Sequence, residues 1–168
     1  MSPKVDIKRE MKQISEGIHE AILQTRMLAR GLSPVDVEAG GLMTALKELA
    51  ENTERLFRIS CRFECPRPIL VHDNTVATHL YRIVQEAIQN AVKHGHAYRV
   101  KVSLAKSGPT TTLSIHDNGL GIGSGTKVPQ GMGLRIMHYR ARTIGGKLTV
   151  RPSPRKGTDV VCAFKNSL

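Results

Sequence analysis

The sequence has 168 residues, 40% of them hydrophobic, and a formal net charge of +11. This length suits one domain, or one domain with a short extra element, and it can bury a substantial core. The positive charge favours partners that carry phosphate, but the charges are scattered and aromatic side chains are few, which argues against direct nucleic-acid binding. No apolar run is long enough to span a bilayer, and no secretory signal is visible.

The first predicted element is a helix over residues 7–31. Its apolar seam repeats at alternating steps of three and four residues, with one threonine: Ile7, Met11, Ile14, Ile18, Ala21, Thr25, Leu28 and Leu32. Such a seam is typical of a coiled coil and suggests a partner helix. The alternative is one amphipathic helix folded back onto its own domain. A turn at Ser33-Pro34 ends the segment.

A second helix is predicted over residues 41–58, followed by short β-like runs over residues 59–64 and 69–72. Pro66 and Pro68 separate the two runs, because proline blocks the continuation of a central strand. The three cysteines, Cys61, Cys65 and Cys162, follow no metal-binding spacing. On an extended strand, Cys61 and Cys65 would lie about 13 Å apart, too far for a disulfide. We interpret all three as small apolar residues in a reducing compartment.

A third helix, over residues 79–95 with an N-cap at Asp73 or Asn74, has two contrasting faces. The apolar face comprises Leu80, Val84, Ala87, Ile88 and Ala91. The other side carries Glu86, Asn90, Lys93 and His94. This line of a carboxylate, an amide, an ammonium and an imidazole can hold a hydrated Mg²⁺ and the phosphates around it. The alternative is an ordinary solvated face that ends at Gly95.

Two strands are predicted next, over residues 98–106 and 110–117. Leu113, Ile115 and Asp117 share one face of the second strand, so Asp117 places a carboxylate on the buried side at the strand's end. A buried carboxylate needs a donor, and the exocyclic amine of adenine is a suitable one. The alternative is that Asp117 only caps the following turn. The glycines at positions 119 and 121 favour a pocket.

Residues 121–131 are predicted to form a loop, because they are mostly Gly, Ser, Thr, Lys and Pro. Lys127 lies in this loop and would reach a phosphate or stay solvated. Gly131 and Gly133 leave backbone N–H groups accessible at the start of a helix over residues 134–144, where phosphate is attracted. No P-loop or Rossmann motif is present. Strands over residues 147–151 and 158–164 complete the chain.

The order of three motifs resembles the ATP-binding domain of sensor histidine kinases, in the superfamily shared with gyrase, heat-shock protein 90 and MutL. The motifs are the polar line at residues 86–94, Asp117-Asn118-Gly119-Leu120-Gly121, and Gly131-Met132-Gly133-Leu134. The resemblance implies an α+β fold: a two-layer α/β sandwich of the Bergerat type, with helices on one face of a mixed sheet of about five strands. Residues 1–33 would be the end of a dimerisation hairpin, and residues 34–168 the catalytic ATP-binding domain.

The resemblance also implies a role for each site residue. Asn90 would ligate Mg²⁺, and Glu86 would orient or deprotonate a nearby water. Asp117 would read adenine, with support from Thr158, which is otherwise an ordinary β-branched strand residue. The rest of the ATP site would comprise Lys93, His94, Gly119, Gly121, Ile122, Gly131, Met132, Gly133 and Leu134.

The whole protein implied by the resemblance is a homodimeric sensor kinase. ATP would phosphorylate a histidine in the hairpin, and a response regulator of the helix-turn-helix class would receive the phosphate. His19-Glu20 with Gln24 imitates the acceptor pattern, but no room is left for the second hairpin helix before the ATP-binding domain. We therefore expect the acceptor histidine upstream of Met1, and a cytoplasmic fragment that binds ATP without autophosphorylation; the parent protein can be membrane-anchored.

Two alternatives stay open. A serine kinase of the anti-sigma-factor type shares the ATP-binding fold, but it would need neither the apolar seam nor the join at Leu32-Ser33-Pro34. A non-catalytic basic module would bind nucleic acid or an acidic protein, with a steep salt dependence and no ATP binding.

Overall fold

The structure, a computed structural model, describes residues 10–11, 14–15, 17, 41–122 and 131–166. The chain divides into two compact units, Met1–Pro34 and Val35–Leu168. The described residues of the first unit are helical, and Met11 and Ile14 are exposed. The rest of the helix predicted over residues 7–31, including His19, lies outside the described residues. Its assignment to a dimerisation hairpin therefore stays a prediction.

The described part of the second unit contains three helices and five strands. In chain order they are α2 (Gly41–Phe57), β1 (Ser60–Glu64), α3 (Asn74–Lys93), β2 (Arg99–Ser107), β3 (Thr110–Asp117), α4 (Met132–Thr143), β4 (Lys147–Pro152) and β5 (Thr158–Lys165). The strand order in the sheet is β1-β2-β3-β5-β4. Strands β1 and β2 are parallel, and all other neighbours are antiparallel.

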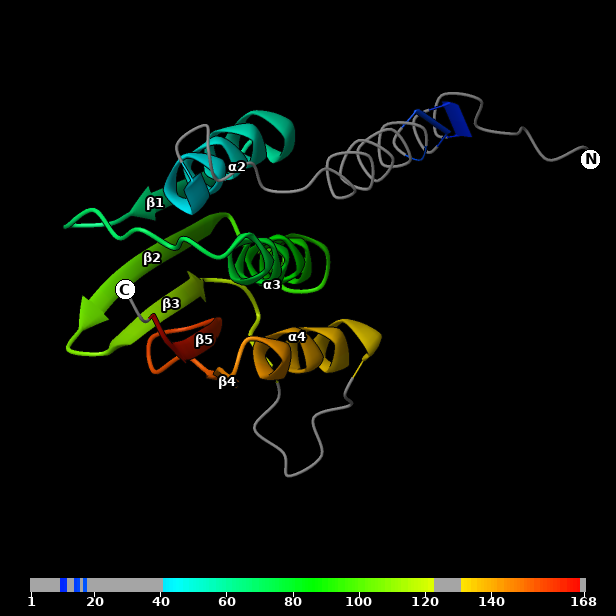
Figure 1. Ribbon diagram of the computed structural model, residues 1–168. Coiled ribbons are helices and arrows are strands. Elements are labelled where there is room, and N and C mark those ends of the chain that lie inside the picture. Colours follow the sequence, from blue (N-terminus) through cyan, green and yellow to red (C-terminus); the bar gives the residue numbers. More distant parts are fainter. Residues whose placement is uncertain (1–9, 12–13, 16, 18–40, 123–130, 167–168) are drawn as a thin grey trace, which may run out of the picture. The chain divides into compact units, whose positions relative to one another are not determined.

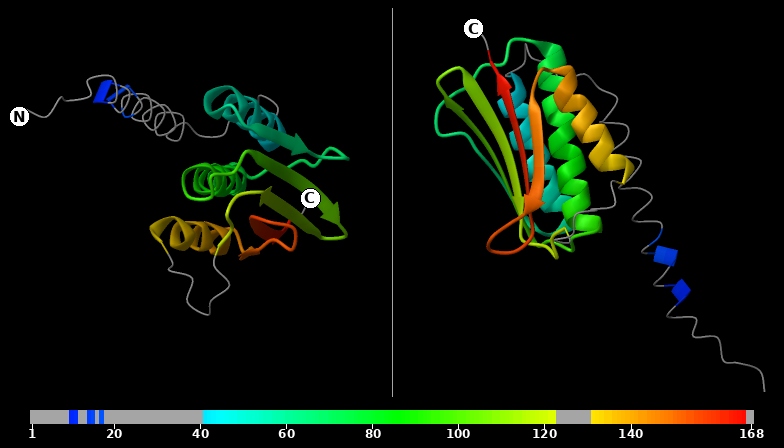
Figure 2. Two further views of the ribbon diagram at one scale, coloured as in Figure 1. Left: turned by 180° about the vertical axis from the view of Figure 1, so that it is seen from behind. Right: turned by 90° about the horizontal axis from the view of Figure 1, so that it is seen from below.

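All three helices cover the same face of the sheet, with α3 between α2 and α4 (Figures 1 and 2). The opposite face carries no helix in the part of the chain that the structure describes. This arrangement confirms the predicted two-layer α+β sandwich with a mixed sheet. Within the same part of the chain, no helix is long and apolar enough to cross a membrane.

The core lies between α3 and the sheet, where the apolar face of the helix meets the alternate buried residues of the strands. Leu80 and Ile83 of α3 and Leu113 of β3 are each 0% exposed. Alternate residues of β3 are buried, and the last of them is Asp117. The same alternation that builds the core therefore also carries one carboxylate to the helix-covered side of the sheet.

Helix α3 begins at Asn74 because Asp73 caps it. Oδ1 of Asp73 accepts hydrogen bonds from the N–H groups of Thr75 at 2.7 Å and Val76 at 3.2 Å. These N–H groups have no partner within the helix, so a side-chain oxygen stabilises its first turn.

We expect Asp73→Ala to lower the free energy of unfolding by about 1 kcal/mol, because it removes this cap. Urea denaturation monitored by circular dichroism measures the change. Asp73→Asn keeps an acceptor oxygen and should retain most of the stability. An equal loss in both variants would show that the charge of Asp73, and not its capping geometry, matters.

One predicted strand is absent, since residues 69–72 form an irregular connection that pairs with no strand. Pro66 and Pro68 carry no N–H group for a sheet ladder. Ile69 and Val71 are nevertheless buried in the core. The connection is held by side chains: the N–H of Ile69 donates to Sδ of Met43 at 3.4 Å, and Nδ2 of Asn166 donates to the carbonyl of Leu70 at 2.8 Å. The alternation of residues 69–72 therefore reflects burial without strand pairing.

The cysteines are free, as expected, and two of them are core residues. Burial raises the pKa of the Cys61 thiol to about 12, with a smaller contribution from the nearby carboxylate of Glu54, and burial raises that of Cys162 to about 11. Both thiols are therefore neutral at physiological pH and behave as small apolar side chains. Cys65 differs, because it is only partly buried and its Sγ donates to the carbonyl of Arg67 at 3.0 Å.

Candidate functional site

The polar line of α3 lies on its last turns, away from the core. Glu86, Asn90 and Lys93 are half-buried, and His94 is exposed at the C-cap. Within the described part of the chain, the side chains of Glu86 and Asn90 have no hydrogen-bond or ion-pair partner. A carboxylate and an amide that are half-buried and unpaired, one helical turn apart, are available to an external ligand.

The N-terminus of α4 lies directly over Glu86. A methyl group at Gly133 would overlap Oε1 of Glu86 and would lie 3.0 Å from its Cδ. Gly131 is the N-cap of α4 and supplies no side-chain hydrogen bond to the first turn. The first N–H groups of a helix have no internal partner and carry the positive end of its dipole. The second glycine motif, at residues 131–134, therefore brings an anion-attracting helix end to the polar line of α3.

Asp117 lies at the end of β3 and is 6% exposed. Its Oδ1 accepts a hydrogen bond from the N–H of Gly119 at 2.8 Å. The turn-capping role considered above is therefore present, but it uses only one carboxylate oxygen. Oδ2 makes no hydrogen bond within the described residues. One oxygen of a largely buried carboxylate thus stays available as an acceptor.

Glycines allow several chain segments to converge on Asp117. A methyl group at Gly157 would overlap the carbonyl oxygen of Asp117, and one at Gly119 would overlap the carbonyl oxygen of Gly95. Gly121 has a positive φ of 79°, and a methyl group there would lie 2.8 Å from the carbonyl oxygen of Gly157. The end of α3, the end of β3 and the start of β5 therefore meet around one carboxylate.

Asn118 is a positioning residue that the sequence pattern did not identify. Its Oδ1 accepts hydrogen bonds from the N–H groups of Tyr98 at 3.2 Å and Arg99 at 2.9 Å, and its own N–H donates to the carbonyl of Arg99 at 3.2 Å. Asn118 thereby fixes the turn after Asp117 to the start of β2. The position of Asn118 between Asp117 and Gly119 could have indicated a role in the site. Its partners lie about twenty residues away in the chain, so a local sequence pattern does not predict them.

The remaining predicted site residues differ in their burial. Thr158 pairs with Pro152 at the start of β5, directly after Gly157. Gly121 and Ile122 are half-buried, and Leu134 packs against the core. Met132 is 78% exposed and points into solvent. Lys127 lies among residues 123–130, outside the described part of the chain.

The flank of α3 that faces α4 is positively charged. Nη1 of Arg140 lies 3.4 Å from Nδ1 of His79, and Nη1 of Arg82 donates to Oε1 of Gln85 at 3.2 Å. Burial, and then the neighbouring Arg140, lower the pKa of His79 and that of Arg82. His79 therefore stays neutral at physiological pH, while the two arginines attract anions toward this flank.

The match to known proteins covers all three motifs. The family model of histidine kinase-, DNA gyrase B- and HSP90-like ATPases matches residues 75–167, more than half of the chain. The chain belongs to this ATPase family. The matched region contains the three predicted motifs in the predicted order: the polar line of α3, the Asp117 turn and the N-terminus of α4.

Relatives of this ATPase-family chain include sensor proteins. The nitrate/nitrite sensor protein NarQ of Escherichia coli is 32% identical over 159 residues, which cover 94% of this chain and 28% of NarQ. The sensor histidine kinase LiaS of Bacillus subtilis is 30% identical over 152 residues, which cover 90% of this chain and 42% of LiaS. The chain therefore spans less than half the length of either relative.

A solved structure supports the same placement in the ATPase family. The crystal structure of the ATP-binding domain of PrrB from Mycobacterium tuberculosis is similar with a TM-score of 0.62 and 26% sequence identity. The similarity covers 76% of this chain and 96% of that domain. The arrangement of α2 to α4 on the mixed sheet is thus the arrangement of a known nucleotide-binding domain.

Proposed function

We propose that this chain is the ATP- and Mg²⁺-binding catalytic domain of a sensor histidine kinase. The observation that carries the proposal is the position of Glu86 and Asn90 one turn apart on α3, without a side-chain partner among the described residues, together with the approach of Gly133 at the N-terminus of α4 to Glu86. Family membership supplies ATP as the nucleotide, and the named relatives are sensor kinases. These relatives disfavour both the serine kinase and the non-catalytic basic module.

The donor set fits a magnesium nucleotide. Mg²⁺ prefers oxygen ligands and often takes only one or two from the protein, the others being water and phosphate. The described residues contain no cluster of three or more His, Cys, Asp or Glu, so a metal held by the protein alone is not expected there. Asn90 would supply one amide oxygen, and Glu86, one turn earlier, would orient or deprotonate a water.

Phosphoryl transfer depends mainly on positioning and charge neutralisation. When bound, ATP supplies the phosphoryl group and Mg²⁺ neutralises part of the phosphate charge. Lys93, His94 and the first N–H groups of α4 would hold the phosphates. Asp117 would accept a hydrogen bond from the adenine amine through Oδ2, and Thr158 would support the base. Gly119 and Gly121 would shape the pocket by letting chain segments converge on Asp117, and Gly131 would leave backbone N–H groups accessible.

The whole protein's partners belong to the same proposal. We expect a homodimer whose histidine-bearing domain accepts the phosphoryl group, and a response regulator that receives it. His19 lies outside the described residues, and its dismissal as the acceptor stays a prediction. The isolated fragment should bind ATP without autophosphorylating, in a cytoplasmic setting.

The first test is calorimetric titration with a non-hydrolysable ATP analogue, with and without Mg²⁺, and with the corresponding GTP analogue. We expect adenine to be preferred and binding to strengthen with Mg²⁺. Asp117→Asn should weaken ATP-analogue binding roughly tenfold or more, because an amide replaces a charged acceptor. Its remaining oxygen can still accept from Gly119, so the turn should survive. If the variant distinguished the two nucleotides as the parent does, Asp117 would be a structural residue.

A further inference from the structure

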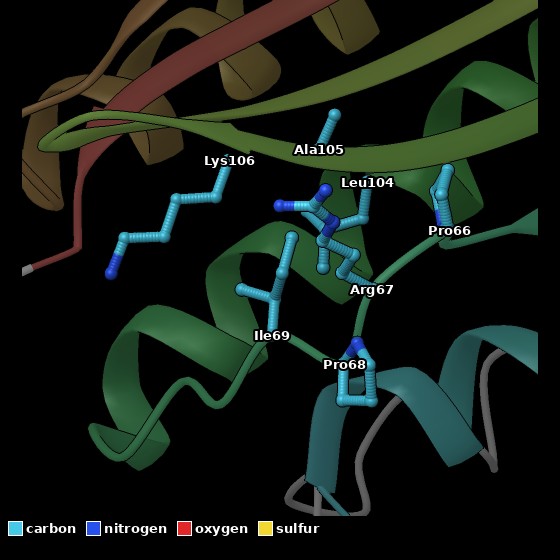
Figure 3. Close-up of a pocket in the computed structure, with 7 residues that line it drawn as sticks. All are labelled: Pro66, Arg67, Pro68, Ile69, Leu104, Ala105 and Lys106. Atoms are coloured by element: carbon cyan, nitrogen blue, oxygen red, sulfur yellow. The ribbon is translucent and has the colours of Figure 1, made fainter.

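A concave site lies at the end of β2 opposite to the Asp117 turn. It is a hollow of ≈ 460 Å³ lined by Pro66, Arg67, Pro68, Ile69, Leu104, Ala105 and Lys106 (Figure 3). In the sheet, Lys106 pairs with Thr111, whereas Val100 pairs with Asp117. The hollow is therefore separated from the Asp117 site by most of the length of β2. None of the residues assigned to nucleotide binding lines it.

The hollow exists because β1 ends before β2 does. Pairing of the two strands stops at Glu64 with Ser103, while β2 continues to Ser107. Pro66 and Pro68 lead the chain away from the sheet until Ile69 enters the core. Over residues 104–107, β2 consequently has only β3 as a described neighbour. Such a strand edge presents unpaired backbone groups that another extended chain can use.

The side chains of the hollow combine an apolar floor with two cations. Figure 3 shows Arg67 coming from the connecting segment and Lys106 from β2, with Ile69 between them. Within the described residues, neither cation has an ion-pair or hydrogen-bond partner for its side chain. Lys101, earlier on β2, is by contrast paired with Glu64 at 2.8 Å. No described residue therefore pairs with the positive charge at the hollow.

We propose that this hollow binds an extended acidic peptide segment of a partner protein. An apolar side chain would fill the floor, and neighbouring carboxylates would meet Arg67 and Lys106. The peptide backbone would add to the free edge of β2, a recognised mode of peptide binding in which side-chain pockets give specificity. No aromatic side chain lines the hollow, so stacking of nucleic-acid bases has no platform here. Because the site is remote from Asn90 and Asp117, a docked peptide leaves the nucleotide residues free.

The experiment selects random octapeptides displayed on phage against the 168-residue chain. We expect enriched sequences in which Asp or Glu adjoins an aliphatic residue. Fluorescence polarisation then measures one selected peptide against the parent chain and two double variants. Arg67→Glu with Lys106→Glu should weaken binding about tenfold or more, because attraction becomes repulsion. Arg142→Glu in the last turn of α4, with Lys147→Glu on the edge strand β4, changes the net charge equally away from the hollow, and it should change affinity less than about twofold.

The position of the bound peptide on the protein is the second readout. The bound peptide should shift the backbone amide resonances of residues 104–107, and the double variant at the hollow should keep the parent's affinity for the ATP analogue. Selected peptides without an acidic–aliphatic pattern would overturn the proposal. Binding that survives the double charge reversal, or resonance shifts confined to other surfaces, would overturn it as well. Loss of ATP-analogue binding in the double variant at the hollow would overturn the proposal that the two sites are independent.

Discussion

Asn90→Ala is expected to reduce ATP-analogue binding in Mg²⁺ to the level measured without Mg²⁺. The amide oxygen of Asn90 is the protein ligand proposed for the metal, and alanine offers no oxygen. The fold should be unaffected, because the Asn90 side chain has no hydrogen bond to lose within the described residues. Alanine is also the better helix former. Calorimetry with and without Mg²⁺ measures the affinity for the ATP analogue, and urea denaturation measures the free energy of unfolding.

Two matched variants make the result specific. Gln89→Ala removes a neighbouring amide of the same helix that is not part of the polar line, and it should leave Mg²⁺-dependent binding unchanged. Glu86→Gln should leave nucleotide affinity close to the parent value, because Glu86 is assigned to a water and not to the metal. Unchanged affinity in Asn90→Ala would remove the metal assignment. A comparable loss in Gln89→Ala would point to a general disturbance of α3.

Gly157→Ala is expected to destabilise the protein by about 3 kcal/mol or more. Gly157 has a positive φ of 89°, a backbone conformation that residues with a Cβ atom rarely adopt. The added methyl group would also overlap the carbonyl oxygen of Asp117. That oxygen belongs to the backbone of β3, so relief requires the ends of β3 and β5 to move apart. Nucleotide binding should fall together with stability, because Asp117 moves.

Gly108→Ala is the control for this prediction. Gly108 also has a positive φ, of 58°, but a methyl group there would meet no atom within 4 Å. Backbone strain alone should cost about 1 kcal/mol, and nucleotide affinity should not change. Urea denaturation measures the free energy of unfolding of both variants. The difference between them separates the cost of backbone strain from the cost of the steric overlap. Equal losses would mean that the close approach of Gly157 to Asp117 does not constrain the site.

Local patterns were sufficient to predict the three helices and most strands in the described part of the second unit. The apolar repeat of α3 and the alternation of β2 and β3 depend only on helix and strand geometry, so they can be read without knowing any partner. The predicted mixed sheet with helices on one face is confirmed. The strand predicted at residues 69–72 does not form, and the prediction is wrong because buried alternation looks the same whether or not a neighbouring strand supplies hydrogen bonds. Pro66 and Pro68 were the signal that none would follow.

The candidate site was predictable in its residue types but not in its contacts. The sequence by itself determined the family, because the carboxylate, the amide and the glycine pairs occur in a specific order. It also placed Asp117 on the buried side of its strand. The roles of these residues in binding ATP and Mg²⁺ remain predictions that the variants above test.

The tertiary structure decided which segments approach one another. A side chain at position 133 would displace the carboxylate of Glu86, and Gly157 is needed because β5 begins against the backbone of Asp117. Asn118 joins the turn after β3 to the start of β2. The hollow at Arg67 and Lys106 arises from the unequal lengths of two paired strands. Such contacts join residues far apart in the chain, and packing sets them, whereas a sequence pattern records only what is local.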